Sequence, residues 1–157
     1  MTTSLMSYSL GRPLVSSRGK PAVIDIDGLL KGLSILLVED DLDSAELFNF
    51  VFEIASAQVV TVPSAGEALL RLETYQPDIL VSNIVLPDID GYSLVEWVRT
   101  YEKERGREII AVAVTASARD VDRAKAMSAG FRTHIPKPIE PATLVTELAK
   151  LTGRITS

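Results

Sequence analysis

Several apolar runs in this chain end in side chains that carry charge or form strong hydrogen bonds. The run at 34–38 is followed directly by three acids, and the run at 79–83 ends in Asn83. Thr115 ends a later run, and Lys137 follows the last one. If these runs are parallel strands, their carboxyl ends meet at the edge of the sheet where ligands bind in open α/β folds. Acids, an amide, a hydroxyl and an ammonium would then share one polar site.

The segments that must position this site alternate between short apolar runs and amphipathic stretches. We predict strands at 34–38, 58–62, 79–83, 109–115 and 133–136. We predict helices at 41–55, 64–75, 92–104, 120–129 and 140–152. Alternating strands and helices predict right-handed βαβ units and a parallel sheet with helices on both faces. Five units predict an α/β fold of the flavodoxin-like, doubly wound type, with strand order 2-1-3-4-5.

The first residues differ from the rest in composition. Residues 1–32 are rich in Ser, Gly and Pro, which predicts a flexible arm or linker before a domain at 33–153 and a short tail at 154–157. Within the arm, Ala22–Asp27 is a candidate short strand. No effector domain is visible, so we expect a stand-alone domain or a piece of a longer protein.

Composition excludes several classes of function. The net charge is −5 and the sequence pI is about 4.9, which disfavours nucleic-acid binding. The absence of cysteine excludes disulfides, Cys-ligated zinc and thiol catalysis. No stretch reaches the roughly 18 apolar residues of a membrane span, and no signal peptide is visible. We therefore expect a cytoplasmic protein. No glycine-rich phosphate loop occurs, so nucleotide binding has no support.

The sequences at the strand ends resemble the receiver domain of response regulators in two-component signalling. The resemblance extends over about 33–151, and its order and spacing are specific to that family. The matched pieces are 35–41 (ILLVEDD), 84–91 (IVLPDIDG), 114–116 (VTA) and 137–138 (KP).

The resemblance implies a signal-transduction module of a phosphorelay that is not an enzyme and acts through protein contacts. The partners it implies are a sensor histidine kinase, a histidine phosphotransfer protein, or an adjacent domain of a parent chain. The family's usual contact surface corresponds to about 120–151. The stretch 130–134 resembles receivers at the ends of hybrid sensor kinases, which favours an adjacent domain.

The resemblance also implies roles for individual residues. Glu39 and Asp40 match the acidic pair that binds Mg²⁺, with the main-chain carbonyl of Val85 as a further ligand. Thr115 matches the hydroxyl that hydrogen-bonds the phosphoryl group, and Lys137 matches the cation that pairs with that group. The oxygens of Glu39, Asp40 and the Val85 carbonyl are hard ligands, which suit Mg²⁺.

Asn83 stands where the family has the aspartate that accepts the phosphoryl group. That reaction needs a carboxylate nucleophile and yields an acyl phosphate, whereas an amide is a poor nucleophile. The amide oxygen can still ligate a metal, but the lost negative charge predicts a weakened Mg²⁺ site. We also expect Lys137 to lean toward Asp40. Three explanations stay open: natural loss of the acceptor, an engineered Asp→Asn change in a conventional phospho-accepting receiver, or weak acceptance by Asp41 or Asp88.

Three further features have an ordinary and a functional interpretation. His134, the single histidine, matches a mobile aromatic that moves together with Thr115, so both are candidate switch residues; we predict a partly exposed surface side chain. Trp97 is predicted to lie in the core. A basic run is predicted to form a solvated helix end: Arg99, Lys103, Arg105 and Arg107.

A different class of function would be a phosphatase-like enzyme with an aspartyl nucleophile. Asp40 would be that nucleophile. The D-x-D pattern expected of such an enzyme is absent, because Asp41 follows directly and Leu42 is apolar. The sequence therefore favours the signalling module.

Overall fold

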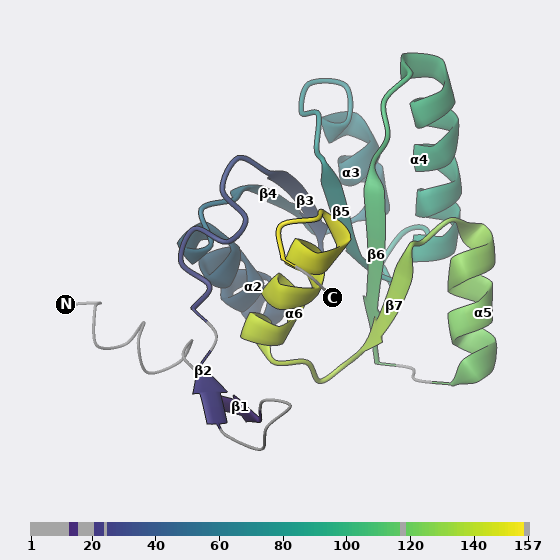
Figure 1. The fold of residues 1–157 in the computed structure, drawn as a ribbon. Coiled ribbons are helices and arrows are strands. Elements are labelled where there is room, and N and C mark those ends of the chain that lie inside the picture. Colours follow the sequence, from purple (N-terminus) through teal and green to yellow (C-terminus); the bar gives the residue numbers. More distant parts are fainter. Residues whose placement is uncertain (1–12, 16–20, 24, 117–118, 156–157) are drawn as a thin grey trace.

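A five-stranded parallel sheet forms the centre of the domain (Figure 1). The computed structural model describes residues 13–15, 21–23, 25–116 and 119–155. The strands of the sheet are β3 (Ser34–Val38), β4 (Gln58–Val62), β5 (Ile79–Asn83), β6 (Ile110–Thr115) and β7 (Thr133–Pro136). Their order is β4-β3-β5-β6-β7, and every neighbouring pair is parallel. This is the order 2-1-3-4-5, so the predicted flavodoxin-like α/β fold is confirmed.

Helices cover both faces of the sheet. They are α2 (Leu42–Ile54), α3 (Ala65–Arg71), α4 (Gly91–Arg105), α5 (Asp120–Ala129) and α6 (Pro141–Leu151). Helices α2 and α6 lie on one face, and α3, α4 and α5 lie on the other (Figure 1). None of the helices in the described residues has both the length and the apolar character needed to cross a membrane.

The sheet separates two apolar cores because alternate residues of a strand point to opposite faces. In β3, Ile35 and Leu37 belong to the core beneath α2 and α6, whereas Leu36 and Val38 belong to the core beneath α3, α4 and α5. All four are at most 2% exposed. A strand buried on both faces explains the continuous apolar run in the sequence.

Local capping signals set the helix boundaries. Asp41 accepts a hydrogen bond from the Ser44 amide at the start of α2, and Ser64 does the same for the Glu67 amide at α3. Helix α3 ends at Arg71 rather than at about residue 75. Beyond it the amides of Glu73 and Thr74 bond carbonyls three residues earlier, although the Tyr75 amide still bonds the Arg71 carbonyl with four-residue spacing.

The segment that precedes the sheet packs against it. Ile26 and Leu30 are 1% and 0% exposed and belong to the core beneath α2 and α6. The Leu30 amide also donates to the Ala55 carbonyl at 2.9 Å, at the end of α2. The prediction of a flexible arm is therefore wrong for residues 25–32, because two apolar side chains in that segment complete the core.

The other N-terminal predictions have a mixed outcome. Strands β1 (Pro13–Val15) and β2 (Pro21–Val23) form an antiparallel pair, so the expected short strand lies at 21–23 rather than 22–27. Most of the remaining predicted arm, at 1–12 and 16–20, lies outside the described residues. The predicted limits of the domain, 33–153 with a tail at 154–157, stay a prediction.

Two side chains differ from their predicted burial. Trp97 is 62% exposed, because α4 turns Leu94, Val95 and Val98 toward the sheet and leaves Trp97 on another face. His134 is only 3% exposed. It lies on β7 opposite Ala113, and α5 packs on this strand. The predictions of a core Trp97 and a partly exposed His134 are therefore wrong.

Burial affects the protonation of His134. Its Nε2 atom is buried and has no hydrogen-bond partner among the residues that the structure describes. Desolvation lowers the pKa of His134, and the positive charge of Arg123 lowers it further. The folded protein therefore favours the neutral imidazole.

Replacing Leu30 by Ala should destabilise the domain by about 2–5 kcal/mol, because it leaves a cavity in the core. Urea unfolding followed by circular dichroism measures this loss. Leu70→Ala is the matched control: Leu70 is 71% exposed, and its truncation should change the free energy by no more than about 0.5 kcal/mol. Equal effects of the two changes would contradict the assignment of residues 25–32 to the core.

The neutral state of His134 should make stability depend on pH. A lowered pKa means that the unfolded chain binds more protons than the folded chain below the ordinary value of about 6.5. This contribution is present above that value and is lost as the pH falls through the folded-state pKa. A His134→Phe variant should therefore lose less stability than the wild type between about pH 7.5 and about pH 5. Parallel losses in urea unfolding would show that His134 makes no contribution.

Candidate functional site

The carboxyl ends of β3, β5 and β7 bring three of the predicted site residues into contact. The Lys137 Nζ atom lies 2.8 Å from Glu39 Oε1, and the Asn83 Nδ2 atom lies 3.3 Å from Glu39 Oε2. Thr115 ends β6 beside them: the Lys137 amide donates to its carbonyl at 2.7 Å. The parallel sheet thus joins residues that are 98 positions apart in the sequence.

Glu39 is the centre of this group. Its side chain is 3% exposed, and Lys137 is 24% exposed. Besides the two side chains, the Asp41 amide donates to Glu39 Oε2 at 3.1 Å. A buried carboxylate needs such a set of donors, and removing one partner of a buried ion pair typically costs about 3–5 kcal/mol.

Lys137 pairs with Glu39 rather than with Asp40, so the prediction that it leans toward Asp40 is wrong. Successive side chains at the end of a strand point to opposite sides. Glu39 points inward, and Asp40 is exposed. The inward carboxylate is the one that the ammonium reaches.

Asn83 uses both ends of its amide. Its nitrogen donates to Glu39, and its oxygen accepts from the Ile84 amide at 2.9 Å. A carboxylate at this position could not donate to Glu39. Gly91, the first residue of α4, fixes the adjacent backbone: its amide donates to Ile84, and a Cβ here would lie 2.7 Å from the Asn83 carbonyl oxygen. Only a residue without a Cβ allows α4 to start so close to β5.

The assignment of Glu39, Asp40, Asn83 and the Val85 carbonyl as Mg²⁺ ligands stays a prediction. Mg²⁺ needs oxygens at about 2.0–2.1 Å in a near-octahedral shell. The oxygens of Glu39 and Asn83 accept hydrogen bonds, and Asp40 lies exposed to solvent. Within the described residues, no group of three or more His, Asp or Glu side chains is placed to hold a metal.

The two alternative acceptors cap helices instead. Asp41 caps α2, and its pKa is lowered mainly by the hydrogen bond with Ser44. Asp88 accepts from the Ala65 and Gly66 amides at 3.1 and 2.8 Å, at the start of α3. The bond from Gly66 is the main cause of the lowered pKa of Asp88. Both carboxylates therefore have structural partners.

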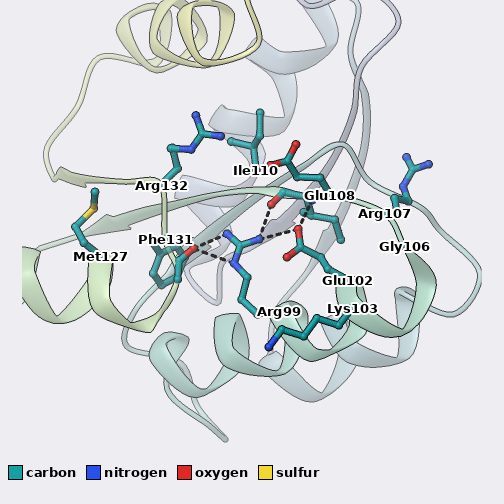
Figure 2. Close-up of a pocket in the computed structure, with 12 residues that line it drawn as sticks. Arg99, Glu102, Lys103, Gly106, Arg107, Glu108, Ile110, Met127, Phe131 and Arg132 are labelled. Atoms are coloured by element: carbon teal, nitrogen blue, oxygen red, sulfur yellow. Dashed lines mark hydrogen bonds and ion pairs between the residues drawn. The ribbon is translucent and has the colours of Figure 1, made fainter.

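A hollow of about 590 Å³ lies at the amino end of β6, away from the site at the carboxyl ends of the strands (Figure 2). Figure 2 shows Arg99 at its centre, between Glu102 and Phe131. Arg99 donates to the carbonyls of Ile109 and Gly130 and forms an ion pair with Glu102.

The prediction of a solvated basic run is consequently wrong for Arg99, which joins α4 to β6 and α5. It is also wrong for Arg107, which donates to the Gln76 carbonyl and to Asp78. The helical spacing of Arg99 and Arg107 in the sequence does not predict either set of contacts. Arg99 therefore has a structural role in this hollow.

Comparisons with known proteins identify the family of this domain. The family model of the response regulator receiver domain matches residues 35–149. An uncharacterized 14.6 kDa protein of Leptolyngbya boryana is 40% identical over 116 residues, which cover 74% of this chain and 87% of that protein. Hybrid signal transduction histidine kinase D of Dictyostelium discoideum is 32% identical over 71% of this chain, which corresponds to 8% of that kinase.

Solved structures show the same fold. A CheY-like response regulator receiver domain protein from Methanospirillum hungatei superposes with a TM-score of 0.69 at 26% identity. The alignment covers 80% of this chain and 96% of that protein. The fold, the strand-end residues and the match over most of the chain lead to one conclusion: this chain belongs to the response regulator receiver domain family of two-component signalling.

Proposed function

We propose that this domain is a receiver module that acts through protein contacts and does not accept a phosphoryl group. The observation that supports this is the amide of Asn83 in the place of the acceptor carboxylate. Acceptance would require a carboxylate oxygen to attack phosphorus and form an acyl phosphate. The Asn83 amide has no such oxygen, and its two polar atoms are engaged by Glu39 and Ile84.

The positions of the other pocket residues support the proposal that the rest of the phosphoryl site is retained. Thr115 and Lys137 lie at the ends of β6 and β7, where a hydroxyl and an ammonium would contact a phosphoryl group. We propose that these residues, with Glu39 and Asp40, would serve an acceptor if one were restored. Mg²⁺ binding should be weak in the present chain, because the site has one carboxylate fewer.

Receiver domains interact with histidine kinases and phosphotransfer proteins. For this chain we propose a sensor kinase, a phosphotransfer protein or an adjacent domain of its parent chain as the partner, in the cytoplasm. The relationship to a hybrid kinase supports the third of these. The proposed contact surface consists of α5, β7 and α6, with Thr115 and His134 as the residues that transmit changes in the pocket.

The acceptance reaction can be tested with acetyl phosphate and Mg²⁺. In an Asn83→Asp variant, the new carboxylate should attack phosphorus and release acetate, so that intact mass spectrometry shows one added phosphoryl group. The wild type should show no adduct. Asn49→Asp is a matched control, because it introduces the same charge on α2 and should leave the protein unmodified.

Two outcomes would contradict the proposal. An adduct on the wild type would show that another residue accepts phosphate, and peptide mapping would decide between Asp41 and Asp88. An Asn83→Asp variant that folds but gains no adduct would show that the pocket has lost more than its nucleophile.

A further inference from the structure

Both oxygens of the Glu39 carboxylate already accept hydrogen bonds. Oε1 accepts from Lys137 at 2.8 Å, and Oε2 accepts from the Asn83 side chain at 3.3 Å and the Asp41 amide at 3.1 Å. The carboxylate is 3% exposed. A divalent cation that bound this carboxylate would compete with these donors for its oxygens.

Among the three side chains of this group the charges also balance without a metal, whereas the neighbouring carboxylates of Asp40 and Asp41 are exposed to solvent. Glu39 contributes one negative charge and Lys137 one positive charge, while Asn83 is neutral. A carboxylate at position 83 would add a second negative charge beside Glu39, and like charges at this distance need a further cation. The amide removes that need and instead donates a hydrogen bond to Glu39.

We propose that the ammonium of Lys137 takes the place of a divalent cation in this pocket. The Lys137–Glu39–Asn83 network, defined by these three residues, holds the carboxyl ends of β3 and β5 and the segment after β7 together without metal. This inference rests on the proposed function only in that both assign Asn83 to the acceptor position. It adds that Lys137 itself opposes the binding of Mg²⁺ in the pocket.

The physical reason is competition for one carboxylate. An ion at Glu39 would displace Lys137 or be repelled by it, because two cations would share one buried anion. Displaced Lys137 would lose its partner while only 24% exposed, and an unpaired charge in such a position is unfavourable. Asp40 remains exposed, but a single carboxylate is a weak Mg²⁺ ligand.

The test is a Mg²⁺ titration of the full chain, followed by thermal unfolding and by amide chemical shifts. For the wild type, Mg²⁺ in the low millimolar range should leave the Tm and the Glu39 and Asn83 signals unchanged. For Lys137→Met, Mg²⁺ should raise the Tm, and its affinity should exceed that of the wild type by at least about tenfold, since a neighbouring positive charge is gone.

Two control variants separate competition between Lys137 and Mg²⁺ from the general effect of changing a lysine. Lys137→Arg keeps the charge and should behave like the wild type. Lys150→Met removes a lysine from an exposed pair with Glu147 on α6 and should also leave Mg²⁺ binding unchanged.

The wild type alone can overturn the proposal, even if Lys137→Met does not fold. A Tm that rises with Mg²⁺, or saturable shifts at Glu39, would show that the lysine does not exclude the ion. Equal affinities of the wild type and a folded Lys137→Met variant would do the same. The two proposals fail separately, because an acetyl phosphate adduct on the wild type would refute the proposed function and not the metal-free network.

Discussion

The ion pair between Glu39 and Lys137 connects the start of the domain to its end. Glu39 follows β3 near one edge of the sheet, and Lys137 follows β7 at the other edge. Asn83, from the strand that lies between β3 and β6, donates to the same carboxylate. Because the Glu39 side chain is only 3% exposed, the donors around it hold together the segments that follow β3, β5 and β7. One carboxylate therefore orders the loops at the carboxyl ends of the strands, which is where parallel α/β sheets bind their ligands.

The strand order and most helix boundaries follow from patterns visible in the sequence. Apolar runs such as 34–38 predict strands buried on both faces, and Asp41 and Ser64 mark helix starts by capping. Glu39, Asn83, Thr115 and Lys137 could be assigned to one site because parallel topology places all strand ends on one side. The family resemblance and the observed geometry agree on these points.

Other features depend on side-chain direction, which periodicity does not specify. Lys137 selects Glu39 because that side chain points inward, although Asp40 is equally acidic. His134 is buried because its place on β7 faces α5, and Trp97 is exposed because it lies outside the stripe formed by Leu94, Val95 and Val98. Ile26 and Leu30 lie in the segment 1–32, whose Gly and Ser content predicts a linker. Composition describes the average of a segment, whereas two well-placed apolar residues decide its packing.

Arg99 has a consequence for the mechanics of α5. It binds the Gly130 carbonyl at the carboxyl end of this helix and the Ile109 carbonyl at the start of β6. The amino end of α5, at Arg119, has no side-chain capping bond. The middle of the helix is held as well, because Lys125 lies 4.5 Å from the centre of the Tyr92 ring on α4. A partner that displaces α5 must therefore carry α4 with it or break one of these two contacts.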